Sequence, residues 1–399
     1  MSPKLSIEDV ELSGQRALVR VDYNVPFLEG TSIISDDTRI KASIPTLRHL
    51  LGKGCSLVLC SHLGRPKGKR YPELSLKPIA KRLSEILEQK VQFVEDCVSE
   101  EATAAAWKLS EGEILLLENL RFHRGEEENN LGFAEQLSKL AEVFINDAFG
   151  AAHRAHASTL GVTRFLPSYA GLLLDKEVNY LENALENPKL PFTAILGGAK
   201  VSDKIKVVDR LTKIASHICI GGGMAATFLA ASNKKVGNSS IEADFISQAQ
   251  TLLNENDSKN GNLILPSDVV VVKTLLKDSD FLAKSVGDLE DGDIIVDIGP
   301  ATAEFYSSII RKSNTVLWNG PMGIYEWEKA RAGTRSVAKA LANGNMLSII
   351  GGGSTVDAVN FLGLQAQMTH VSTGGGASLE LLEGRELPGV TSLREKIEG

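Results

Sequence analysis

Basic side chains gather near the ends of apolar segments in the first half of the chain. They are Arg20, Arg39, His62, Arg65, Arg121 and Arg154. Most of the loops that carry them follow predicted strands, and ligands of open α/β sheets bind just outside the carboxyl ends of the strands. Guanidinium groups meet phosphate or carboxylate oxygens in a bidentate way. We therefore expect most of these residues to share one rim of a sheet and to bind an anion.

Arg39 and the pair Asp22 and Asn24 carry weaker signals. Arg39 falls in the first turn of a predicted helix, where the helix dipole disfavours a cation, so its position hints at function. Asp22 and Asn24 follow the strand-like run 16–21 and precede Pro26. Both residue types favour turns, and the spacing alone favours that interpretation. The alternative is that they bond the hydroxyl groups of a substrate.

Glycine-rich junctions between predicted strands and helices mark the second half. They are Gly197-Gly198, Gly221–Gly223, the segment 319–323, Gly351–Gly353 and Gly374–Gly376. Backbone N–H groups at helix N-termini bind phosphates, so the repetition predicts a phosphate-binding surface. Lys200 and Lys204 are expected to share a helix face at i and i+4. Neither the P-loop spacing nor the dinucleotide fingerprint G-x-G-x-x-G is present after a strand.

The alternation of short apolar runs and amphipathic segments predicts parallel α/β sheets. Strands are expected at 16–21, 56–60, 114–117, 143–145, 193–196, 218–220, 316–318, 347–350 and 371–372. Helices are expected from about residue 38, and at 76–87, 102–109, 167–185 and 379–382. The helix 167–185 connects two domains or is a further crossover helix; we prefer the connection, because a new strand follows near the chain midpoint.

Bulk properties restrict the class of protein. A chain of 399 residues is too long for one ordinary core, so two domains are expected. The net charge of −7 argues against nucleic acid as the main partner. Four cysteines without a CxxC pair are typical of a reduced cytoplasmic protein. No apolar run approaches the roughly 20 residues that span a membrane, and no signal peptide is apparent.

The combined motifs resemble the phosphoglycerate kinase family over nearly the whole chain. They are R-V-D-Y-N-V-P (20–26), S-H-L-G-R-P (61–66), E-N-L-R-F-H-R-G-E-E (118–127), N-D-A-F-G-A-A-H-R-A-H-A-S (146–158), L-G-G-A-K-V-S-D-K-I (196–205), W-N-G-P-M-G-I-Y-E (318–326) and S-T-G-G-G-A-S (372–378). The resemblance implies two doubly wound, Rossmann-like parallel-sheet domains facing across a cleft. The implied parts are a 3-phosphoglycerate domain (1–170), an interdomain helix (171–187), a nucleotide domain (188–378) and a C-terminal segment (379–399) that returns to the first domain.

The resemblance also implies roles for individual residues. The substrate-binding residues would be Asp22, Asn24, Arg39, His62, Arg65, Arg121 and Arg154. The nucleotide-binding residues would be Lys200, Lys204, Gly221, Asn319, Pro321, Glu326, Gly352, Gly353, Ser354 and Thr355. The catalytic residues would be Arg39, Lys200 and Gly375.

The implied reaction is reversible, in-line transfer of the ATP γ-phosphoryl to the carboxylate of 3-phosphoglycerate, with hinge closure, no general base, and Mg²⁺ bound with ATP or ADP. A monomer is also implied. Two positions depart from the family pattern. Ser354 stands where Asp is usual, and Asp357 either replaces it as a metal ligand or is simply a solvated helix residue. Ile295 stands where Gly is more common, which leaves the shape of the adenine pocket open.

Two other functions are compatible with parts of the pattern. A nucleotide-binding protein of this fold that has lost catalysis would explain Ser354, but the chain retains every charge that transfer needs. A dinucleotide oxidoreductase is disfavoured by the missing fingerprint. A purely structural role would leave the clustered cations unexplained.

Overall fold

A computed structural model describes residues 2–259 and 261–396, with side chains described except for those of 256–259. The chain forms two compact units. Unit 1 comprises residues 1–179 and 386–399, and unit 2 comprises residues 180–385. Each is built around a six-stranded parallel sheet, so the predicted α/β class is confirmed.

The sheet of unit 1 has the strand order β3-β4-β2-β1-β5-β6. Its strands are β1 (Arg16–Arg20), β2 (Ser56–Cys60), β3 (Val91–Val94), β4 (Ile114–Leu117), β5 (Val143–Asn146) and β6 (Ser168–Ala170). The helices of this unit are α1 (Thr38–Gly52), α2 (Lys77–Leu87), α3 (Glu100–Trp107), α4 (Arg124–Glu127), α5 (Leu131–Ser138) and α14 (Pro388–Thr391). The central strands β1, β2 and β4 are buried along nearly their whole length, because helices cover both faces of a parallel sheet.

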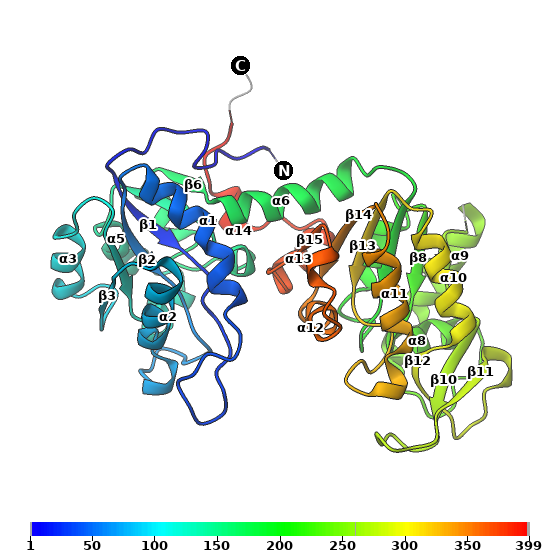
Figure 1. Cartoon of the computed structure of the whole chain (residues 1–399). Coiled ribbons are helices and arrows are strands. Elements are labelled where there is room, and N and C mark those ends of the chain that lie inside the picture. Colours follow the sequence, from blue (N-terminus) through cyan, green and yellow to red (C-terminus); the bar gives the residue numbers. More distant parts are fainter. Residues whose placement is uncertain (1, 260, 397–399) are drawn as a thin grey trace. The chain divides into compact units, whose positions relative to one another are not determined.

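Helices α1 and α2 bury their apolar faces together against one side of this sheet, through residues such as Leu47 and Leu83. Figure 1 shows α3 and α5 on the other side. Covering both faces in this way makes the unit doubly wound, and it leaves the loops at the strand ends free to carry polar side chains.

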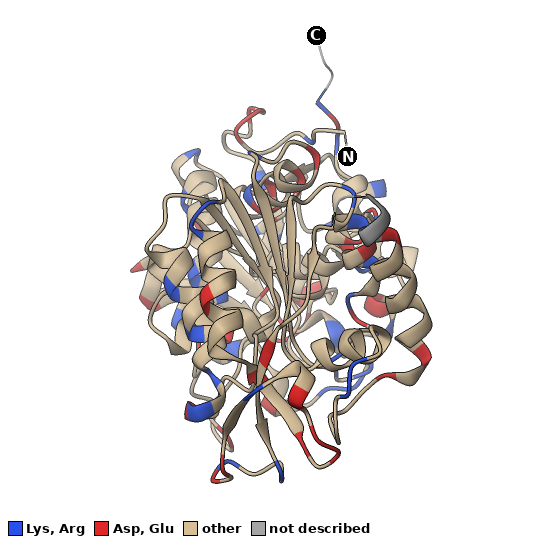
Figure 2. Cartoon of the chain, turned by 90° about the vertical axis from the view of Figure 1, so that its right-hand side faces the viewer, with Lys and Arg blue, Asp and Glu red and all other residues tan. Residues whose placement is uncertain are grey.

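The larger sheet of unit 2 has the order β15-β14-β13-β7-β8-β9. Its strands are β7 (Phe192–Leu196), β8 (His217–Ile220), β9 (Leu263–Ile264), β13 (Thr315–Asn319), β14 (Leu347–Gly351) and β15 (His370–Val371). The helices are α7 (Ile205–Leu211), α8 (Met224–Ala231), α9 (Ile246–Lys259), α10 (Pro300–Ile310), α11 (Ala332–Ala342), α12 (Gly353–Phe361) and α13 (Gly376–Leu382). Figure 2 views the chain from the side of this unit and shows helices flanking the sheet on both sides.

A second, antiparallel sheet of three strands belongs to unit 2 and is absent from the sequence-based prediction. Its order is β11-β10-β12, with β10 (Asp268–Val272), β11 (Leu282–Ser285) and β12 (Ile294–Ile298). Short 3₁₀ helices complete the fold: η1 (Pro72–Leu74), η2 (Leu120–Phe122), η3 (Phe149–Ala151), η4 (Gly161–Arg164), η5 (Ala243–Phe245), η6 (Val286–Asp288), η7 (Glu328–Ala330) and η8 (Gln365–Gln367).

The predicted single helix 167–185 is wrong at its start. Residues 168–170 form the edge strand β6, and the helix α6 spans Leu172–Glu186. The break lies at Gly171, where a Cβ atom would fall 2.2 Å from Oδ1 of Asp147. That carboxylate accepts the backbone N–H of Leu173 at 2.9 Å, so it satisfies an otherwise free donor of the first helical turn.

The bounds of the units differ from the predicted domain bounds. The first division falls within α6, between Asn179 and Tyr180. Residues 379–385 belong to unit 2, since Arg210 of α7 donates to the carbonyl of Leu381 at 2.8 Å. The chain rejoins unit 1 from residue 386, and the side chain of Asn146 on β5 donates to the carbonyl of Gly389 at 2.8 Å. Residues 397–399 of the predicted returning segment lie outside the described residues.

Candidate active site

Four neighbouring strands of unit 1 end in the predicted anion-binding loops. The order β4-β2-β1-β5 places the loops of Arg121, His62, Asp22 and Arg154 at the carboxyl ends of adjacent parallel strands. Buried apolar side chains line most of these strands and fix their register. The polar residues that follow each strand therefore lie at one edge of the sheet.

His62 is the centre of this group. Burial first, and then the nearby charges of Arg20, Arg121, Arg154 and Arg39, hold the pKa of His62 well below its usual range. Nη2 of Arg20 lies 3.0 Å from Nδ1 of His62. Because a guanidinium group can only donate, Nδ1 accepts and the ring proton resides on Nε2. His62 is therefore a neutral N–H donor surrounded by permanent cations.

Arg20 lies beneath the rim rather than on it. It is fully buried, and its Nε donates to Oγ of Ser158 at 2.8 Å. Ser158 in turn donates to the buried carboxylate of Glu126 at 2.6 Å. Glu126 supplies a counter-charge within the cation cluster, and burial is the main reason that its pKa is raised. Sequence reasoning missed Glu126, since the run of three glutamates around it suggests a solvated surface.

Arg121 carries a buried N–H group that is free to meet a ligand. Its side chain is 2% exposed, and Nη1 donates to the carbonyl of Gly64 at 2.7 Å. Nη2 is buried and has no hydrogen-bond partner among the described residues. Burial, and then the charge of Arg154, lowers the pKa of Arg121 to about 10. An oxyanion would satisfy this donor and offset the repulsion between the two guanidinium groups.

The side chains of Asp22 and Asn24 form hydrogen bonds with other groups of the protein. Asp22 accepts two contacts from Nη1 of Arg39, at 3.2 and 3.3 Å, and Arg39 also donates to the carbonyl of Asn24 at 3.1 Å. Oδ1 of Asn24 accepts the backbone N–H of Gly64 at 2.9 Å. Oδ1 of Asp22 also accepts the backbone N–H of Asn24 at 3.1 Å, so the turn chemistry favoured from the sequence is present, and the same carboxylate orients Arg39. The side chain of Arg65 is exposed, and its role as a ligand contact stays a prediction.

In unit 2, five neighbouring strands end at the glycine-rich junctions, in the order β15-β14-β13-β7-β8. The junctions after β7 and β13 approach so closely that a Cβ on Gly320 would lie 2.2 Å from the backbone of Gly197. Gly320 also has φ of +102°, a conformation that side chains rarely adopt. Several of these glycines thus permit backbone packing, which brings the junctions together. Gly221 and Pro321 are buried within this packing.

The predicted helix face shared by Lys200 and Lys204 is wrong. Residues 201–204 form a turn, α7 begins at Ile205, and Lys204 is its N-cap residue. Lys200 is exposed in the preceding loop, whereas Lys204 is buried, which lowers its pKa. The Nζ atom of Lys204 would lie 3.2 Å from a Cβ on Gly198. The missing side chain of Gly198 therefore gives the ammonium group access to the junction backbone.

The loops after β13 and β14 are joined at the start of α12. Oγ1 of Thr355 accepts the backbone N–H of Gly320 at 2.6 Å. Nδ2 of Asn319 is buried and lacks a hydrogen-bond partner in the part of the chain that the structure describes. Gly353 and Ser354 are exposed in the first turn of α12, so its free N–H groups face solvent. Gly375 is the N-cap residue of the short helix α13, as Gly352 is of α12.

Glu326 and Asp357 are both exposed, and both act on the partly buried Tyr325. Burial first, and then the charges of Glu326 and Asp357, raises the pKa of Tyr325. Asp357 lies one helical turn after Ser354 on α12. A carboxylate and a hydroxyl at one helix end are oxygen donors of the kind that hard cations prefer, so these residues fit Mg²⁺.

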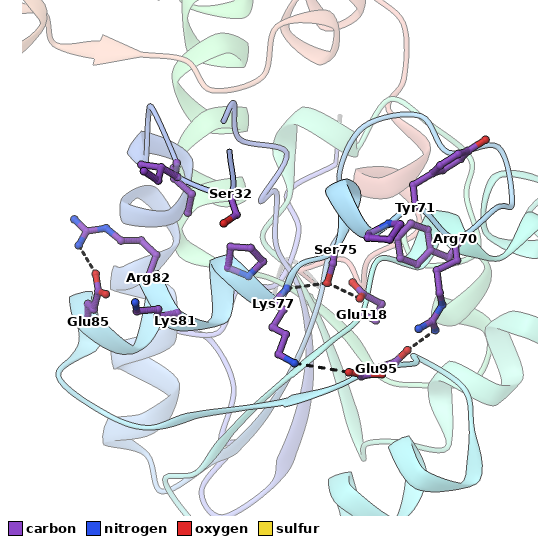
Figure 3. Close-up of a pocket in the computed structure, with 15 residues that line it drawn as sticks. Ser32, Arg70, Tyr71, Ser75, Lys77, Lys81, Arg82, Glu85, Glu95 and Glu118 are labelled. Carbon is purple, nitrogen blue, oxygen red and sulfur yellow. Dashed lines mark hydrogen bonds and ion pairs between the residues drawn. The ribbon is translucent and has the colours of Figure 1, made fainter. Parts of the chain in front are cut away.

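A cavity of about 980 Å³ lies elsewhere in unit 1, and none of the predicted site residues lines it. Figure 3 shows two cations of its wall paired with carboxylates, Lys77 with Glu95 at 3.7 Å and Arg82 with Glu85 at 2.8 Å. Because these cations already have partners, the cavity is a poorer anion site than the strand ends around His62.

Guanidinium groups at one set of strand ends, and glycine-rich helix N-termini at another, define a class of α/β enzymes that handle phosphate groups. The sequence matches the profile of the family described as phosphoglycerate kinase over residues 7–385, and the chain belongs to that family.

Named relatives agree with this assignment. Phosphoglycerate kinase of Herpetosiphon aurantiacus is 50% identical over 393 residues, which cover 98% of this chain and 100% of the relative. That of Moorella thermoacetica is also 50% identical with the same coverage. The solved structure of phosphoglycerate kinase from Coxiella burnetii superposes with a TM-score of 0.89 at 38% identity and covers 98% of each chain. In the described part of this chain, no helix is both long and apolar enough to cross a membrane.

Proposed function

We propose that this chain catalyses the reversible transfer of the ATP γ-phosphoryl to the carboxylate of 3-phosphoglycerate, giving ADP and 1,3-bisphosphoglycerate. The observation that carries the proposal is a buried N–H of Arg121 that has no hydrogen-bond partner among the described residues, beside the neutral His62 and within a cluster of guanidinium groups. Such donors suit a small ligand that carries both a phosphate and a carboxylate. The family to which the chain belongs performs this reaction.

In this proposal unit 1 binds 3-phosphoglycerate. Arg121, Arg154, Arg65 and His62 hold its phosphate and carboxylate, and Asp22 keeps Arg39 oriented through the bonds between them. Arg39 then meets the transferred phosphoryl. In this proposal Asn24 and Asp22 also contact the glycerate hydroxyl. Because His62 donates a hydrogen bond without carrying a charge, the ligand would be bound in the same way throughout the neutral pH range.

Unit 2 binds the nucleotide. The N-termini of α12 and α13 offer backbone N–H groups to its phosphates, Lys204 pairs with them, and Lys200 and Gly375 contact the phosphoryl in transfer. Asn319, Pro321, Gly221 and the α12 residues Gly352 to Thr355 form the rest of the phosphate site, and Glu326 binds the ribose. Ser354 and Asp357 would hold a Mg²⁺ ion that arrives with the nucleotide, and that ion would neutralise phosphate charge.

No side chain has to remove a proton, because the acceptor is already a carboxylate. Catalysis then depends on positioning and on charge neutralisation, as phosphoryl transfer generally does. In-line transfer requires the two ligands to meet with water excluded. We therefore expect a smaller radius of gyration in solution scattering when both ligands are bound than with either one. The chain is expected to act as a cytoplasmic monomer.

Two variants test this division of labour. We expect Arg121→Met to weaken the binding of 3-phosphoglycerate by at least about tenfold, because it removes a charge-assisted donor worth roughly 1.5–3 kcal/mol. ADP affinity should stay unchanged. Lys204→Met should weaken the binding of ADP and leave the affinity for 3-phosphoglycerate unchanged. Calorimetric titration measures both affinities, and a coupled assay that follows NADH measures turnover.

The same assays distinguish a nucleotide-binding protein without catalysis. That protein would bind ADP and lose affinity in Lys204→Met, yet show no turnover in the unmodified chain. An equal loss of affinity for both ligands in either variant would contradict the assignment of one ligand to each unit.

A further inference from the structure

Three metal-ligating side chains of different kinds come together in unit 1, outside the candidate active site. One ligand atom each of Asp96, Cys97 and His123 lies within 4.8 Å of the others. Asp96 and Cys97 follow β3, and His123 follows η2. A carboxylate oxygen, a thiol sulfur and an imidazole nitrogen thus converge from two separate segments of the chain.

The local backbone holds these groups in place. Oδ1 of Asp96 accepts the backbone N–H groups of Cys97 at 2.6 Å and Val98 at 3.1 Å. Nε2 of His123 lies 3.1 Å from the same oxygen, and its ring packs on Phe133 with 5.2 Å between the centroids. Ligands fixed in this way lose little freedom when they bind an ion.

The group is partly open to solvent. The side chains of Asp96 and His123 are 32% and 31% exposed, whereas Cys97 is fully buried behind them. An ion can therefore reach the carboxylate and the imidazole from solvent, where it would replace the hydrogen bond between them, and the buried sulfur would be its third ligand.

We propose that Asp96, Cys97 and His123 form a binding site for a borderline divalent cation of the Zn²⁺ class. Oxygen, nitrogen and sulfur donors together suit Zn²⁺, whereas Mg²⁺ and Ca²⁺ prefer oxygen alone. Three protein ligands leave a fourth tetrahedral position for water on the exposed side. The site is separate from the nucleotide-associated ion, which the proposed function assigns to unit 2.

Binding converts the thiol of Cys97 to a thiolate. The metal–sulfur bond forms, the S–H bond breaks, and the proton passes to solvent. Metal affinity should consequently rise with pH, and each ion bound should release about one proton.

Arg70 competes with the cation for Asp96. Its Nη2 lies 3.8 Å from Oδ2 of Asp96 and donates to the carbonyl of Glu95. Figure 3 shows Arg70 reaching toward Glu95 along the cavity wall. Since the guanidinium charge opposes a bound divalent ion, removing it by Arg70→Gln should tighten metal binding.

The test titrates the full chain with Co²⁺, a spectroscopic substitute for Zn²⁺, in buffer without nucleotide or phosphate. We expect saturation at one ion per chain, with a sulfur-to-cobalt charge-transfer band in the near ultraviolet that excess Zn²⁺ removes. Cys97→Ser should abolish the band. The matched control is Cys55→Ser, another fully buried cysteine of unit 1, which should retain it.

If Cys97→Ser fails to fold, Zn²⁺ affinities of two other variants test the site. His123→Gln should weaken Zn²⁺ binding by more than about tenfold, which is the smallest loss expected when even a hydrogen-bond partner of a metal ligand is removed. Arg70→Gln should strengthen Zn²⁺ binding. The proposal is overturned if Co²⁺ gives no charge-transfer band, or if His123→Gln binds Zn²⁺ as tightly as the unmodified chain. A band that persists in folded Cys97→Ser overturns it as well.

Discussion

Removing the buried charge of Arg20 should destabilise unit 1 far more than removing a surface charge. Arg20 and Glu126 are both fully buried and are linked through Ser158, by bonds of 2.8 and 2.6 Å. Arg20→Met leaves the carboxylate of Glu126 without its nearest counter-charge. Breaking a buried pair from one side typically costs about 3–5 kcal/mol. Because Ser158 still donates to Glu126, we expect a loss near the lower end, about 3 kcal/mol.

A second substitution at Glu126 should restore part of the stability that Arg20→Met removes. In Arg20→Met/Glu126→Gln the buried negative charge is gone, and the amide oxygen can still accept the hydroxyl of Ser158. We expect the double variant to regain about 2 kcal/mol, which is within the range measured for directly coupled residues. Urea unfolding at pH 8, followed by circular dichroism, gives the four free energies of the cycle.

Lys139→Met is the matched control, because Lys139 forms an exposed i,i+4 pair with Glu135 at 3.1 Å. Such pairs contribute about 0.3–0.5 kcal/mol. The reasoning is refuted if Arg20→Met loses no more stability than Lys139→Met. Simple addition of the losses from Arg20→Met and Glu126→Gln would refute it too, since it would show that the two groups are independent.

Three further predictions concern pH, backbone strain and metal use. Burial raises the pKa of Asp147 to about 7, so the native state binds an extra proton and loses stability as pH rises from about 4 to 7. Asp147→Asn should remove up to about 4 kcal/mol of that decline, measured by unfolding experiments across this pH range. An unchanged dependence of stability on pH in Asp147→Asn would contradict this prediction. Gly352→Ala should lower the free energy of unfolding by about 1–3 kcal/mol, because φ is +85° and the added Cβ would lie 3.0 Å from Asn319. Gly353→Ala, which has nothing within 4 Å of its Cβ, should leave the free energy of unfolding nearly unchanged. Equal losses of stability in the two variants would count against backbone strain at Gly352. Asp357→Asn should raise the Mg²⁺ concentration needed for half-maximal activity and Ser354→Asp should lower it; unchanged dependence in Asp357→Asn would assign that carboxylate to the solvated surface.

Continuous apolar runs made nine of the twelve strands of the two large sheets predictable, because a buried parallel strand carries few polar residues. The short strands β3, β6 and β9 were missed. The run 56–60 became β2 without a change of bounds. Basic and glycine-rich segments at strand ends could be placed for the same reason, since adjacent parallel strands end at one edge.

Tertiary contacts decide the features that sequence reasoning missed. The strand β6 has only three residues and pairs with β5 along one edge, which leaves little local pattern. The turn 201–204 separates Lys200 from α7 although the sequence has helical spacing. The buried positions of Arg20 and Glu126 depend on Ser158, more than 30 residues beyond Glu126, and single charged residues look solvated in a sequence.

A crystal structure with ADP and 3-phosphoglycerate would test the central claim most directly. We predict density for 3-phosphoglycerate in contact with Nη2 of Arg121 and Nε2 of His62, and nucleotide phosphates at the N-terminus of α12. Density for 3-phosphoglycerate in the 980 Å³ cavity beside Lys77 and Arg82, with the Arg121 site free of ligand, would contradict it.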